Sequence, residues 1–132
     1  MLSICHGTRP HQLLAHNKKV ILLVDVSHCT PEEVQKISAL LPKFVTQEPR
    51  ESVLLLADFT GTKVDRPTAE RLKQDMVFDR PHLKRSAWVG TEGIPHAIFE
   101  NLKTFSRRKI PTFATREEAL AYLTEDEESP HA

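Results

Sequence analysis

Three apolar runs that lack polar alternation constrain the fold of this chain more than any other feature. They are Val20–Val24 with Val26, Val53–Ala57 with Phe59, and Ser86–Val89. A strand with one solvated face alternates apolar and polar residues, whereas a strand buried on both faces forms a continuous apolar run. The three runs therefore predict strands of a parallel sheet that is covered by helices.

The segments between these runs have the apolar spacing of surface helices. Thr30 can cap a helix that starts at Pro31, and Glu33 completes a capping box. Further helices are predicted over 66–79 and 95–106. The residues expected to face inward are Val34, Ile37, Leu40, Leu41, Phe44, Ala69, Leu72, Met76, Ala97, Ile98, Leu102 and Phe105.

The C-terminal part repeats the pattern with a short strand, Ile110–Phe113, and a helix capped by Thr115. Strands and helices thus alternate along the chain, which predicts right-handed crossovers. The expected fold class is α/β, with a single open, mostly parallel sheet and helices on both faces. An extra N-terminal edge strand is expected around Gln12–Ala15.

The length of 132 residues suits one domain, because a second core would have too little surface to bury. We divide the chain into an N-terminal segment (1–17), an α/β domain (18–124) and an acidic, disordered tail (125–132).

The charge balance bears on partners and location. Eighteen Lys and Arg offset eighteen Asp and Glu, so the chain lacks the basic patch expected of a nucleic-acid-binding protein. Its apolar runs are far shorter than the roughly 20 residues of a membrane span. Cys5 and Cys29 have no CxxC spacing, which favours reduced thiols and a cytoplasmic location.

The predicted carboxyl ends of the strands carry two aspartates, Asp25 and Asp58, which could form a paired acidic site for a cation or a phosphoryl group. The more ordinary interpretation is that each carboxylate accepts hydrogen bonds from the turn that follows it. We favour this second interpretation.

The predicted ligand- or partner-binding residues form a rim around the same strand ends. They are Asp58, Thr60, Gly61, Thr62, Gly90, Thr91 and Gly93. Glycine lets backbone N–H groups approach a ligand closely, and the threonines supply hydroxyls beside helix N-termini. Isolated glycines can also serve only to form tight turns, and we weigh the two interpretations equally.

Other candidate sites have weaker support. His6, His11 and His16, with Cys5, are spaced five apart, which suits neither a helix face nor a strand face for zinc. His28 and Cys29 are neighbours in sequence, so their side chains are expected to point apart. We therefore predict no catalytic residues, no metal and no cofactor.

Two phrases of the sequence resemble a known family. The strand ending Leu56-Ala-Asp-Phe-Thr-Gly61 and the capped helix Glu117-Glu-Ala-Leu-Ala-Tyr-Leu123 are similar to the bacterial SpoIIAA-like (STAS/SEC14-like) family, over residues 18–124. The resemblance implies a non-catalytic α/β domain, with STAS relatives that dock onto proteins and SEC14-like relatives that hold lipids. The Asp-Ser-Ser-Gly phosphorylation loop of anti-sigma-factor antagonists corresponds here to Asp58-Phe-Thr-Gly61, which lacks the serine pair.

The resulting functional hypothesis is a non-enzymatic binding or regulatory module. It would take a protein partner or a small anionic or apolar ligand, and the sequence leaves a homodimer open. The alternative is a phosphoryl-accepting, receiver-like or small hydrolytic domain that uses Asp25 and Asp58, with Lys63 or Lys109 as the cation.

Overall fold

A computed structural model describes residues 11–16, 19–106 and 110–125. The elements follow one another as β1 (His11–His16), β2 (Lys19–Asp25), α1 (Pro31–Val45), β3 (Val53–Asp58), α2 (Arg66–Asp79), the 3-10 turn η1 (Arg80–His82), β4 (Leu83–Val89), the 3-10 turn η2 (Thr91–Gly93), α3 (His96–Ser106), β5 (Thr112–Phe113) and α4 (Arg116–Leu123).

The five strands form one sheet in the order β1-β2-β3-β4-β5. β1 is antiparallel to β2, and every other pair is parallel. Val24, Leu55 and Val89 lie on the three central strands and are all buried, which confirms the prediction made from the apolar runs. The predicted N-terminal edge strand is also confirmed, so the sheet begins before residue 18.

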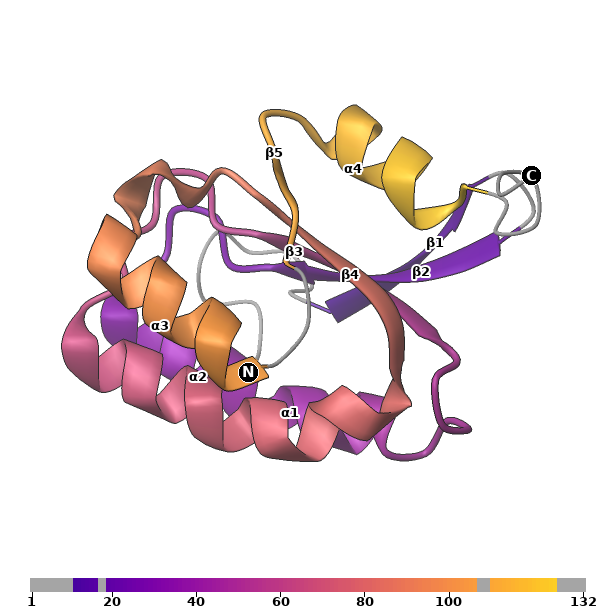
Figure 1. Cartoon of the computed structure of the whole chain (residues 1–132), viewed down its shortest axis with the longest axis horizontal. Helices are drawn as coiled ribbons and strands as arrows, with labels where there is room; N and C mark the ends of the chain where they lie inside the picture. The colour runs from indigo at the N-terminus through magenta and orange to yellow at the C-terminus, as the bar shows by residue number, and fades with distance from the viewer. Residues whose placement is uncertain (1–10, 17–18, 107–109, 126–132) are drawn as a thin grey trace.

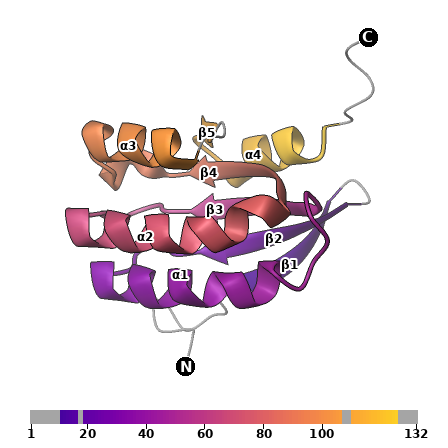
Figure 2. The same ribbon diagram turned by 60° about the horizontal axis from the view of Figure 1, so that its bottom comes forward.

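The helices form two unequal layers (Figures 1 and 2). α1, α2 and α3 cover one face of the sheet, and α4 lies against the opposite face. Each crossover from β2 to β5 moves one strand in the same direction, so right-handed connections place all three helices on one side. The prediction of helices on both faces is confirmed, but within the described chain α4 is the one helix on its side.

Two hydrophobic cores result, one on each side of the sheet. The larger lies under α1–α3 and includes Leu55, Phe59 and Trp88. The smaller lies under α4 and includes Leu56 and Leu123.

The helix starts follow local sequence signals. Thr30 Oγ1 accepts a hydrogen bond from the Glu33 backbone N–H (3.2 Å), and the Glu33 carboxylate accepts one from the Thr30 N–H (2.8 Å), which completes the predicted capping box. Asp65 caps α2 by accepting from the Thr68 N–H (2.9 Å). Hydrogen bonds from Thr68 lower the pKa of the Asp65 carboxyl. Thr115 caps α4 as predicted.

Three residues expected to face inward are exposed instead: Phe44, Ala97 and Phe105. α1 and α3 are the outer helices of their layer, as Figure 2 shows, and each has a helix neighbour on one side only. Phe44 lies on one of these outer helices. Phe105 lies on the side of α3 that faces α2, where the neighbouring side chain is the polar Lys73, whose ammonium is 5.8 Å from the centre of the Phe105 ring.

The expectation of reduced thiols is wrong for Cys29, which is disulfide-bonded. Cys5 and most of the predicted acidic tail lie outside the described residues. Within the described chain, every helix is too short or too polar to cross a membrane.

Candidate functional site

Asp25 and Asp58 stand opposite each other in the register of β2 and β3. Asp25 Oδ1 accepts hydrogen bonds from the backbone N–H (3.0 Å) and the hydroxyl (2.6 Å) of Ser27. Asp58 Oδ1 accepts from the backbone N–H (2.9 Å) and the hydroxyl (2.6 Å) of Thr60. Both carboxylates thus organise the turn that follows their strand, which is the interpretation that the sequence favoured.

Arg116, in the first turn of α4, joins the two aspartates. Its Nε lies 2.7 Å from Asp58 Oδ2, and its Nη2 lies 3.3 Å from Asp25 Oδ2. Burial alone lowers the pKa of the Arg116 guanidinium, but the hydrogen bond and charge of Asp58, together with Asp25, raise it overall. The three charges form a clamp that fastens α4 to the carboxyl edge of the sheet.

This clamp bears on the receiver-like alternative. Both oxygens of Asp58 already accept hydrogen bonds, and the cation that the described residues place beside the pair is Arg116. The receiver-like alternative stays a prediction. Lys63 is exposed, and Lys109 lies outside the described residues. No sequence signal could have identified Arg116, because it lies 58 residues from Asp58 and meets it only through the fold.

The predicted rim residues do lie together, but they pack against one another. Thr62 is buried between two loops, where its hydroxyl donates to the Val26 carbonyl (2.5 Å) and accepts from the Cys29 N–H (3.1 Å). The Thr60 hydroxyl donates to Asp58. These hydroxyls therefore already form internal hydrogen bonds.

The rim glycines allow close packing of the loops. Gly61 and Gly90 have positive φ angles of 71° and 69°. A Cβ on Gly90 would overlap Thr60, and a Cβ on Gly93 would overlap the Thr62 carbonyl. This geometry supports the turn-forming interpretation of the glycines. Thr91 begins the turn η2 and is half-buried.

The strand order bears on ligand binding at this edge of the sheet. In open α/β sheets, ligands collect where the strand order reverses, because adjacent crossovers then diverge to opposite faces. Here the order of the parallel strands β2, β3, β4 and β5 never reverses. Ligand binding at the rim stays a prediction.

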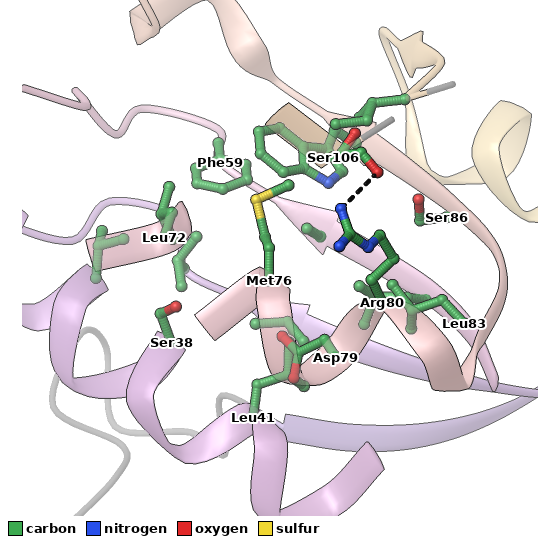
Figure 3. Close-up of a pocket in the computed structure, with 17 residues that line it drawn as sticks. Ser38, Leu41, Phe59, Leu72, Met76, Asp79, Arg80, Leu83, Ser86 and Ser106 are labelled. Carbon is green, nitrogen blue, oxygen red and sulfur yellow. Dashed lines mark hydrogen bonds between the residues drawn. The ribbon is translucent and has the colours of Figure 1, made fainter. Parts of the chain in front are cut away.

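A different site lies between the sheet and helices α1–α3, where the core contains a cavity of about 80 Å³ (Figure 3). Its wall is mostly apolar, and Phe59, Met76 and Trp88 contribute the largest side chains. The full lining consists of Val24, Val26, Val34, Ser38, Leu41, Leu55, Ala57, Phe59, Leu72, Met76, Asp79, Arg80, Leu83, Ser86, Trp88, Ser106 and Ile110.

The polar side chains of this wall are mostly engaged with the protein. The Arg80 guanidinium donates to the carbonyls of Phe105 (3.2 Å) and Ser106 (3.3 Å), as the dashed line in Figure 3 shows for Ser106. The Ser106 hydroxyl donates to the Lys103 carbonyl (2.9 Å). The Ser38 hydroxyl donates to Asp75 (2.6 Å).

Asp79 is the exception. Asp79 is 3% exposed, and its Oδ1 is the one buried side-chain polar atom of the described chain without a hydrogen-bond partner. Burial, with a smaller contribution from the charge of Asp75, raises the pKa of the Asp79 carboxyl to about 8. The spacing of Leu72, Met76 and Asp79 places all three on one helix face, so the sequence pattern could have identified this residue.

Metal binding has no visible basis in the part of the chain that the structure describes, where no three His, Cys, Asp or Glu side chains gather. Of the predicted histidine trio, His6 lies outside the described residues, and His11 and His16 are the two ends of β1.

Comparisons with protein-family models, curated proteins and solved structures gave no match to this chain. The resemblance to the SpoIIAA-like family stays a prediction.

Proposed function

We propose that this protein is a non-enzymatic binding domain that holds a small, largely apolar ligand in the cavity between the sheet and helices α1–α3. The observation that carries the proposal is the cavity itself, with its apolar wall and its buried polar end at Asp79. The ligand would contact Phe59, Met76 and Trp88.

The energetics favour an occupant. Protein interiors are close-packed, and an unfilled void costs about 24 cal/mol per Å³ of cavity. A cavity of about 80 Å³ would then cost about 2 kcal/mol while empty. A ligand that fills the cavity recovers this cost and stabilises the fold by mass action.

The size limits the ligand. An engineered apolar cavity of about 150 Å³ holds benzene. A cavity of about half that volume suits a short alkyl chain of a few carbons. We propose that any effect on a protein partner is exerted through the occupancy of this cavity.

A direct test uses propane as the probe. Trp88 lines the cavity and is the only tryptophan of the chain, so its indole N–H resonance and its fluorescence report on occupancy. We expect saturable perturbation of Trp88 by propane and an increase in melting temperature. Absence of both effects would refute the proposal.

The matched variants are Ser86→Leu and Ala121→Leu. Ser86 lines the cavity, so a leucine there should fill it and weaken propane binding at least tenfold. Ala121 is exposed on α4, on the far side of the sheet, and a leucine there should leave binding unchanged. Equal binding by both variants would show that the probe binds somewhere other than the cavity.

A further inference from the structure

The polar end of the cavity contains an unused hydrogen-bond acceptor. Asp79 Oδ1 is buried and has no partner, and the carboxyl lies against the space enclosed by α1, α2 and β4 (Figure 3). An unsatisfied buried acceptor costs free energy that a donor brought by a ligand would recover. The site therefore favours a ligand with a hydrogen-bond donor at one end.

The charges around Asp79 distinguish a cationic donor from a neutral one. On the same helix, Asp75 is paired with Arg71 (3.3 Å) and accepts the Ser38 hydroxyl (2.6 Å) from α1. Arg80 points toward Ser106 and donates to carbonyls at the end of α3.

The remaining lining residues are uncharged. Arg71 is paired with Asp75, and the Arg80 guanidinium is held by the carbonyls at the end of α3. Asp79 is thus the one acidic side chain of the cavity wall, and its carboxylate, when ionised, would be complemented by a cation.

We infer that the cavity binds a compact aliphatic primary amine, with its ammonium group donating to Asp79 and its alkyl chain lying against Met76, Phe59 and Trp88. This inference rests on the proposed function and names the ligand class. Neither the rim nor the Arg116 clamp takes part in it.

Binding of such an amine is coupled to a proton. Asp79 is mostly protonated at neutral pH, because burial raises its pKa to about 8. An alkylammonium ion then binds as the carboxyl releases its proton to solvent, so the charge of the ammonium group is offset by the new charge of the carboxylate. Affinity should rise by up to about tenfold per pH unit between pH 6 and 8. A neutral ligand should lack this dependence.

The experiment compares ethylamine, ethanol and propane, which have nearly the same size and shape. Binding is followed through the Trp88 indole resonance at pH 6, 7 and 8. We expect ethylamine to bind at least tenfold more tightly than propane at pH 8, with ethanol in between. Asp79→Leu should abolish the preference for the amine and keep propane binding, and Asp79→Asn should reduce the preference to that for a neutral donor.

Glu70→Gln is the matched control, because Glu70 is an exposed acid on the same helix and makes a surface pair with Lys73. It should leave all three affinities unchanged. Binding of propane without any preference for ethylamine would overturn the inference and leave the proposed function standing. Equal affinities for ethanol and ethylamine would also overturn it. Failure of all three probes would refute both.

Discussion

Asp79 should make the stability of this protein decrease as the pH rises. Burial raises the pKa of its carboxyl from the ordinary value of 3.8 to about 8. Below pH 4 the group is protonated in both the folded and the unfolded chain and has no net effect. Between pH 4 and 8 the unfolded chain loses this proton while the folded chain keeps it, so unfolding becomes easier with rising pH.

The size of the effect follows from the pKa. One pH unit corresponds to about 1.4 kcal/mol. Between pH 4 and pH 7 the group should therefore lower the free energy of unfolding by on the order of 4 kcal/mol. This is a large part of the roughly 5–15 kcal/mol that stabilises an ordinary domain. Asp79→Asn cannot ionise, so the variant should be more stable than the wild type at pH 7 and nearly equal to it at pH 4.

The assay is urea unfolding, followed by the fluorescence of Trp88, at several pH values from 4 to 8. The wild-type and Asp79→Asn curves should diverge steadily across this range, and the difference between them isolates Asp79 from other titrating groups. Glu70→Gln should follow the wild type, because exposed surface pairs contribute little. Parallel curves for the wild type and Asp79→Asn would refute the assignment of a buried, unpaired carboxyl.

Three further predictions concern the fold around the candidate sites. Arg116→Met should lower the free energy of unfolding by about 1–3 kcal/mol in urea titrations at pH 7, because it removes the cation that contacts both Asp25 and Asp58, and an unchanged midpoint would contradict the role of the clamp. Thr30→Ala should lower the free energy of unfolding by about 1 kcal/mol in the same assay, because it removes the cap of α1. A decrease of less than a few tenths of a kcal/mol would contradict the role of the capping box. Gly90→Ala should destabilise the fold by more than about 2 kcal/mol, because it combines a positive φ with overlap of the Thr60 backbone, and calorimetry showing an unchanged melting temperature would disprove the close packing of these loops.

Local sequence signals predicted the secondary structure well, because each signal acts within a few residues. The capping box at Thr30 and the span 66–79 of α2 match the structure, as does the burial of the three apolar runs. Each depends on hydrogen bonds or side-chain spacing inside a single element. The sequence therefore determined the elements and the α/β class.

The strand order was decided only by the tertiary structure. A sequence of alternating strands and helices does not say whether successive crossovers move in one direction or reverse. Because they do not reverse here, three helices share one face, and the carboxyl edge lacks the reversal of strand order at which ligands usually collect. The exposure of Phe44, on an outer helix of that layer, was likewise decided by the tertiary arrangement.

The candidate sites also differ in how much of each could be predicted from the sequence. The turn-forming role of Asp25 and Asp58 was visible in sequence, since the donors lie two residues away. Arg116 reaches the same carboxylates from the far end of the chain, and no local pattern reports such a contact. The cavity at Asp79 exists only because helices and strands from distant parts of the chain enclose it. Periodicity places Asp79 on the inner face of its helix, but only packing decides that its Oδ1 meets no hydrogen-bond partner there.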